Sequence, residues 1–240
     1  LTTSLIDAFV DDGTCEFVKQ FAVPLPVTVI AMALNVPDDR LADFKRWSDD
    51  NIAGIGTNIS DDDRVEAERS NIEFQHYFAE QLESRREDPR DDILTNLLNA
   101  RIDKAEDLDI PDEPLTMAEM LSILQQLLVA GNETTTKMLT EMMRLFGENP
   151  DEWATVRADP GAARAAIEET LRLSTPTQGM WRIATRDTEI GGVRIAANDR
   201  VVVMFASANR DSGVFDEPDA FCPARDGLAN HLAFGRGTHF

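Results

Sequence analysis

The chain has 240 residues, of which 42% are hydrophobic and 28% charged, enough apolar side chain for a substantial folded core. Its 44 acidic and 23 basic residues give a formal net charge of −21 at pH 7, which argues against binding to nucleic acid or anionic membranes because both would be repelled. The two cysteines, Cys15 and Cys222, lie far apart and favour a reducing cytoplasm over a disulfide framework.

The N-terminal part of the chain predicts a series of helices. Start and stop signals place them at residues 1–9, 25–34, 38 onward, 60–87 and 93–98. Residues 15–21 are expected to form a short extended segment. In the helix that Ser60 caps, four apolar residues are expected to face inward: Val65, Ile72, Phe78 and Leu82. The longest apolar run, residues 21–36, is too short and too broken by proline to span a bilayer.

A long helix within residues 114–150 is predicted next. Thr116 and Glu119 can form a capping box at its start, and Gly147 marks its end. Its middle, residues 131–136, contains a glycine, an asparagine and three threonines, which are poor helix formers. Two interpretations stay open: this stretch is a functional site, or it is a small-residue patch where another helix crosses closely.

Glu133 and Thr134 lie within this weak middle. The Thr134 hydroxyl can bond the Ala130 carbonyl one turn back, which tends to bend a helix. A carboxylate beside a hydroxyl can relay protons to a bound reactant if the site is otherwise dry. The alternative is that Glu133 faces solvent and Thr134 packs in the ordinary way.

Glu169 and Arg172 can form an ion pair on a helix predicted over residues 160–173. The same spacing occurs in pairs expected to be ordinary surface contacts: Glu66–Arg69, Glu83–Arg86, Glu87–Arg90 and Glu141–Arg144. The pair at Glu169 differs because apolar residues surround it. Charges held in such a setting need further hydrogen bonds, and Arg225 is a candidate third partner.

From Ser174 onward the pattern changes to short strands. Residues 180–186, 193–195 and 200–205 alternate or run apolar between Gly-Gly and Asn-Asp turns, which predicts a small antiparallel sheet. The fold class is therefore mainly α with a small antiparallel β-sheet. Near the end, the glycines of Phe234-Gly235-Arg236-Gly237 let a backbone approach a flat or bulky group closely, although an ordinary turn shows the same pattern.

Five motifs, taken in order, resemble the cytochrome P-450 family in its soluble bacterial form. They are Ala130-Gly131-Asn132-Glu133-Thr134-Thr135, Glu169-Thr170-Leu171-Arg172, Arg182, the segment 208–225 that ends at Arg225, and the run HLAFGRGTHF at residues 231–240. They resemble, in turn, the oxygen-binding signature, the Glu-x-x-Arg pair, a haem-propionate arginine, the third member of a charge triad, and the first part of the haem loop Phe-Gly-x-Gly-x-His-x-Cys. The resemblance covers the whole chain and implies a partial cytochrome P-450 fold.

The resemblance also implies a role for each matching residue. Thr134 and Glu133 would be catalytic, with Thr134 steadying dioxygen and delivering protons that Glu133 helps to supply. The residues expected to bind haem b are Ala130, Gly131, Arg182, Phe234, Gly235 and His239. Glu169, Arg172 and Arg225 would form a structural charge triad. By position alone, the residues expected to line the substrate pocket are Val129, Gln178 and Met180.

We expect the chain to be an internal fragment, a single partial domain over residues 1–240. It starts without methionine, lacks the family's N-terminal helices and stops at Phe240, whereas the family pattern continues with the cysteine whose thiolate ligates iron. Cys222 lies upstream of the haem loop, so no metal ligand is expected within this chain. The fragment alone is expected to be inactive.

For the whole protein, the resemblance implies a monooxygenase that inserts one oxygen atom from O2 into a small apolar organic substrate. Electrons would come from NAD(P)H through a ferredoxin-type donor and its reductase. The expected location is the cytoplasm, with neither nucleic acid nor membrane as a partner. Two alternatives remain open: a haem-free scaffold or binding relic of the same fold, and a hydrolase that uses Glu133 and His239.

Overall fold

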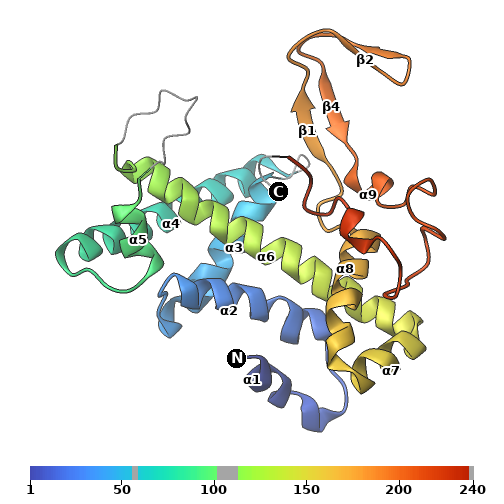
Figure 1. Ribbon diagram of the computed structural model, residues 1–240. Coiled ribbons are helices and arrows are strands. Elements are labelled where there is room, and N and C mark those ends of the chain that lie inside the picture. The colour runs from blue at the N-terminus through green and yellow to red at the C-terminus, as the bar shows by residue number, and fades with distance from the viewer. Residues whose placement is uncertain (56–58, 102–112, 238–240) are drawn as a thin grey trace. The chain divides into compact units, whose positions relative to one another are not determined.

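A computed structural model describes residues 1–55, 59–101 and 113–237 (Figure 1). The chain divides into two compact units, Leu1–Thr136 and Lys137–Phe240, and each is described by itself. The fold is mainly helical with short antiparallel strands, which confirms the predicted fold class. Among the described residues, no helix combines the length and the apolar composition that crossing a bilayer requires.

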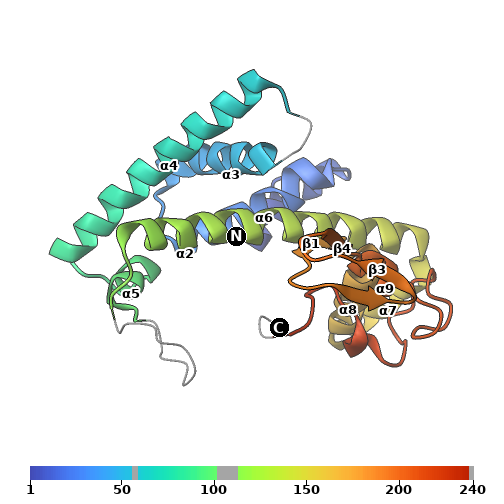
Figure 2. The same cartoon turned by 90° about the horizontal axis from the view of Figure 1, so that it is seen from above.

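The first unit is built from helices. They are α1 (Thr2–Asp7), α2 (Pro24–Ala33), α3 (Leu41–Ile55), α4 (Asp61–Glu87), α5 (Ile93–Asn99) and the first part of α6 (Met117–Glu148). α3 and α4 pack side by side (Figure 2). As predicted, Ser60 caps α4, because its side chain accepts a hydrogen bond from the backbone N–H of Asp63 at 3.1 Å.

Aromatic side chains of α3 and α4 form the core of this unit. The rings of Trp47 and Phe74 lie 5.9 Å apart in an edge-to-face arrangement, and both side chains are fully buried. Phe44 and Phe78 belong to the same cluster, and Leu124 joins it from α6. Since each of these rings buries a large apolar area, the contact between α3 and α4 contributes strongly to the stability of the first unit.

Two details of the first unit differ from the predictions. Residues 15–21 do not form an extended segment: a short π-helix spans Val18–Ala22, and the rings of Phe17 and Phe21 stack at 5.3 Å, a contact that helical i, i+4 spacing permits. Val65 and Ile72 were expected to face inward but are each 52% exposed. The buried stripe of α4 lies on another face and includes polar residues: Ala67, Ser70, Phe74, Phe78, Leu82 and Arg85.

A buried ion pair joins α4 to the start of α5, and Asn35, just after the end of α2, binds the same carboxylate. Asp92, the N-cap of α5, accepts hydrogen bonds from Arg85 Nε at 3.0 Å, from Asn35 Nδ2 at 3.0 Å and from the backbone N–H of Thr95 at 2.8 Å. Burial raises the pKa of the Asp92 carboxyl, but the hydrogen bonds from Thr95, Asn35 and Arg85 outweigh burial, so that the pKa falls to about 2. The ionised carboxylate therefore stabilises this corner of the unit.

α6 begins with the predicted capping box. The backbone N–H of Thr116 donates to Glu119 Oε2 at 2.7 Å, and the backbone N–H of Glu119 donates to Thr116 Oγ1 at 3.3 Å. The helix continues without interruption through residues 131–136. Poor helix formers in the middle therefore do not break it, because packing outweighs local propensity.

The second unit contains the remaining helices and all the strands of the described chain. After the end of α6 come α7 (Pro150–Ala158), α8 (Ala163–Ser174), β1 (Met180–Ile183), β2 (Thr188–Ile190), β3 (Val193–Ile195), β4 (Arg200–Val203) and α9 (Phe205–Ala208). The strands form two antiparallel pairs, β1 with β4 and β2 with β3, where one sheet was predicted (Figure 1). The apolar core of this unit is a cluster around Phe146, Ala166 and Phe221.

Candidate functional site

The weak middle of α6 is a place of close packing within the first unit. A side chain at Gly131 would stand 2.8 Å from Ile30 Cδ1 of α2, so the glycine leaves room for that residue. Asn132 is buried and donates from Nδ2 to Ser48 Oγ of α3 at 2.6 Å. Thr136 Oγ1 donates to the Ala22 carbonyl at 3.1 Å. One of the two open interpretations, a close helix crossing, therefore holds for part of this stretch.

The predicted proton-relay pair lies in the same turn. Thr134 Oγ1 donates to the Ala130 carbonyl at 2.7 Å, the bond expected from the sequence. Glu133 and Thr134 are both partly exposed. The helix is continuous at this bond, so the hydroxyl is held in a fixed direction by its own backbone. The proton-relay role stays a prediction.

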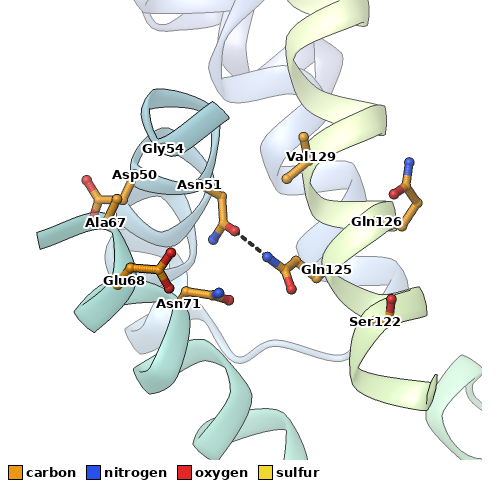
Figure 3. A pocket seen from close by; sticks show the side chains of 10 residues that line it. All are labelled: Asp50, Asn51, Gly54, Ala67, Glu68, Asn71, Ser122, Gln125, Gln126 and Val129. Carbon is orange, nitrogen blue, oxygen red and sulfur yellow. Dashed lines mark hydrogen bonds between the residues drawn. The ribbon is translucent and has the colours of Figure 1, made fainter. Parts of the chain in front are cut away.

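Residues predicted to bind haem or substrate line two hollows of the first unit. Ala130 and Gly131 line an apolar groove of about 410 Å³ together with residues of α2, among them Ile30. Val129 lines a polar cavity of about 280 Å³ between α3, α4 and α6 (Figure 3). In the second hollow, Gln125 Nε2 donates to Asn51 Oδ1 at 2.6 Å, a bond that links α6 to α3.

Glu169 and Arg172 form a fully buried ion pair in the second unit. Arg172 binds the Glu169 carboxylate with two hydrogen bonds, Nε to Oε2 at 2.7 Å and Nη2 to Oε1 at 2.8 Å. Arg225 Nε approaches Glu169 Oε1 at 3.2 Å, and the backbone N–H of Cys222 donates to the same oxygen at 2.9 Å. One carboxylate thus meets two guanidinium groups.

The guanidinium groups also bind backbone carbonyls of the segment after α9. Arg172 donates to the carbonyls of Asn209 at 2.6 Å and Pro218 at 2.8 Å, and Arg225 donates to that of Glu217 at 3.0 Å. The cluster therefore ties α8 to the irregular segment that follows α9, whose own backbone hydrogen bonds are local turns. By contrast, the predicted surface pair Glu66–Arg69 is 3.6 Å long and its side chains are 63% and 73% exposed.

Of the predicted surface pairs in which Arg follows Glu by three residues, not all form. Glu83–Arg86 and Glu141–Arg144 are ion pairs at 3.2 Å and 2.9 Å. Arg90 instead pairs with Asp88 at 3.6 Å, because Pro89 ends the helix before the i, i+3 geometry is reached. The predicted partner Glu87 belongs to the last turn of α4. Spacing alone therefore does not identify the buried pair at Glu169.

A cavity of about 600 Å³ in the second unit brings four predicted residues together. Met180 and Arg182 of β1 line it, and Phe234 and Gly235 line it from the loop near the end of the chain. Gly235 has φ +75°, and a side chain there would meet the Phe205 ring at 3.8 Å. Arg236 is the second charged residue that lines this cavity. It was not singled out from the sequence, although it lies between the two glycines of the same Gly-x-Gly.

The chemistry of this cavity fits a flat apolar group that carries carboxylates. Phe205 and Phe234 supply apolar surface, while Arg182 and Arg236 supply positive charge. Haem b, the predicted cofactor, has this combination of an apolar ring and two propionates. Gln178 does not line this cavity but a separate hollow of about 420 Å³ in the same unit. His239 lies outside the described residues.

Comparisons with known proteins point to one family. The family model described as Cytochrome P450 matches residues 162–239. The chain is 35% identical over its whole length to a steroid C26-monooxygenase of Mycobacterium tuberculosis, of which it covers 62%, and 34% identical to the 6-deoxyerythronolide B hydroxylase of Saccharopolyspora erythraea, of which it covers 56%. It spans about three fifths of the length of these relatives.

A solved structure agrees with the sequence comparisons. Cytochrome P450 CYP109Q5 from Chondromyces apiculatus is 40% identical and matches 99% of this chain with a TM-score of 0.86. The match covers 56% of that protein. Similarity in sequence and in fold therefore extends over both units of this chain.

Proposed function

The chain belongs to the cytochrome P450 family, and from this premise we propose that the whole protein is a haem-thiolate monooxygenase. Proteins of this family bind haem b, which when bound supplies the activation of O2. The observation that carries the proposal is the cavity that joins Arg182, Phe234 and Gly235. Its apolar walls and its guanidinium groups suit the cofactor of the family.

Residues of both units would contact that cofactor. In the second unit, Arg182 and His239 would hold propionates, Phe234 would shield the thiolate ligand, and Gly235 would let the backbone come close to the ring. In the first unit, Ala130 and Gly131 would bind the cofactor. The buried triad of Glu169, Arg172 and Arg225 would keep the segment after α9 in place, which its bonds to the carbonyls of that segment support.

Proton delivery is the proposed task of Glu133 and Thr134. The Thr134 hydroxyl donates its one proton to the Ala130 carbonyl, so its oxygen is free to accept a hydrogen bond from another donor. To pass a proton on, the hydroxyl would release the Ala130 carbonyl while accepting a proton from the other side. Glu133 is partly exposed and can exchange protons with solvent. Together they would carry protons from water to the reacting oxygen.

The substrate is proposed to be a small organic molecule that is mainly apolar. The apolar groove around Ile30, Ala130 and Gly131 supports this class. Val129 in the first unit, and Gln178 and Met180 in the second, are the residues proposed to line the substrate pocket. We also propose that the electrons come from NAD(P)H through a ferredoxin-type donor. The protein is proposed to lie in the cytoplasm, with residues 1–240 as part of a single domain.

Haem content of the purified whole protein tests the proposal. We expect close to one haem per chain, and weaker haem retention in Arg182→Ala than in Arg186→Ala, a matched exposed arginine just beyond the end of β1. Equal haem retention in the two variants would contradict the role of Arg182. A whole protein that folds but purifies without haem would favour the haem-free scaffold instead.

A further inference from the structure

Asn209, the residue after α9, is fully buried and bonds in three directions. Its side-chain Oδ1 accepts from the backbone N–H of Leu232 at 2.6 Å, and its Nδ2 donates to Thr175 Oγ1 at 2.8 Å. Its backbone carbonyl accepts from Arg172 Nη1 at 2.6 Å. Every polar atom of its side chain therefore has a partner, and the partners come from distant parts of the second unit.

The orientation of this amide is fixed by its partners. Thr175 Oγ1 donates its own proton to the Arg172 carbonyl at 2.8 Å, so toward Asn209 it can only accept. The backbone N–H of Leu232 can only donate, so it must face Oδ1. Asn209 thus connects the buried arginine of the charge triad to one backbone amide in the loop that follows.

That loop carries two residues of the proposed haem cavity. The backbone N–H of Gly235 donates to the Leu232 carbonyl at 3.0 Å, which closes a turn around Ala233 and Phe234. Phe234 is 65% exposed at the tip of this turn. The bond from Leu232 to Asn209 therefore fixes the start of the turn that presents Phe234.

A second bond anchors the other side of the same turn. The His231 ring is buried and its Nδ1 accepts from the backbone N–H of Ala233 at 3.2 Å, so the ring proton lies on Nε2. Nε2 lies 2.9 Å from Glu168 Oε2 and donates to it. Glu168 is the neighbour of Glu169 on α8, so both anchors lead to the same helix.

We infer that Asn209 is a positioning residue that couples the Arg172 cluster to the turn Leu232–Gly235 and thereby sets where Phe234 stands in the cavity. The part of this inference that concerns haem rests on the proposed function. The part that concerns the turn does not, because it depends only on hydrogen bonds inside the second unit.

Hydrogen–deuterium exchange of the Leu232 amide in the whole protein tests the coupling. Asn209→Ala removes the acceptor, and we expect exchange about tenfold faster. Asn209→Asp keeps an acceptor oxygen for Leu232 but loses the donor to Thr175 Oγ1, so exchange should be faster than in the original protein and slower than in Asn209→Ala. Asn230→Ala, an exposed asparagine beside the turn, is the matched control and should leave the rate unchanged. Unchanged exchange in Asn209→Ala, or equal acceleration in Ala and Asp variants, would overturn the inference.

Thr175 provides a second test if Asn209→Ala does not fold. Thr175→Val removes the oxygen that holds the Asn209 amide and should accelerate Leu232 exchange in the same direction, by about threefold. Thr175→Ser keeps that oxygen and should leave the exchange rate of the Leu232 amide at its original value. Acceleration in Thr175→Ser with none in Thr175→Val, which keeps the volume, would show that side-chain volume and not the hydrogen bond controls the turn.

The haem spectrum gives the functional readout. In the haem-loaded whole protein, Asn209→Ala should shift the reduction potential and the Soret band of the reduced carbon monoxide complex, whereas Asn209→Asp should shift them less. If the turn loosens while both spectroscopic values stay unchanged, the link from Asn209 to the cavity is wrong. If the original protein binds no haem, the proposed function fails, while the exchange rates still decide the coupling.

Discussion

Glu169→Gln removes the negative charge of the buried triad and leaves the shape of the side chain nearly unchanged. The Arg172 side chain is fully buried and that of Arg225 is 7% exposed, so both positive charges would remain in place with only neutral acceptors, the glutamine amide oxygen and backbone carbonyls, as partners. Removing one partner of a buried ion pair costs about 3–5 kcal/mol. At about 1.4 kcal/mol for each factor of ten, the ratio of unfolded to folded protein rises by a factor of about one hundred to a few thousand.

Urea unfolding of the whole protein, followed by circular dichroism, measures this cost. The matched control is Glu66→Gln, because the Glu66–Arg69 pair has the same spacing but is highly exposed. The control should change the free energy of unfolding by less than about 0.5 kcal/mol. If the two variants lose the same small amount, the reasoning from burial is refuted.

Three further predictions concern other residues. Thr134→Ala in the whole protein should still consume reductant but release much of it as peroxide, and Thr134→Ser should retain coupling; unchanged coupling in Thr134→Ala would exclude the relay. The lowered pKa of Asp92 contributes about 2 kcal/mol of stability above about pH 4, which is lost as the pH falls toward 2, and Asp92→Asn should remove this pH dependence in acid unfolding. Gly147→Ala, with open space around it, should stabilise the protein by about 0.5–1 kcal/mol, whereas Gly131→Ala, which meets Ile30, should gain less or lose stability in the same unfolding assay.

Local signals in the sequence predicted the helix boundaries well. The capping box of Thr116 and Glu119 and the cap at Ser60 depend on residues a few positions apart, so the sequence contains all the partners. The faces of α4 were predicted less well. Val65 and Ile72 are apolar but exposed, because the buried stripe includes Ser70 and Arg85, whose partners Arg46 and Asp92 lie on other elements.

In the candidate site, too, contacts between residues close in sequence could be predicted, whereas contacts between distant residues could not. The spacing of Glu169 and Arg172 was visible, but the same spacing at exposed pairs made it uninformative until burial was known. Asn209 gave no signal, because its partners Thr175 and Leu232 are distant in sequence. The motif order identified the family, whereas the hydrogen-bond network that holds the loop required the structure.

The most direct test of the central claim is the carbon monoxide difference spectrum of the reduced whole protein. We predict a Soret band at the position typical of a thiolate-ligated haem, because the whole protein is proposed to be a haem-thiolate monooxygenase. A folded whole protein that shows no carbon monoxide complex, or one whose Soret band is that of a histidine-ligated haem, would contradict it.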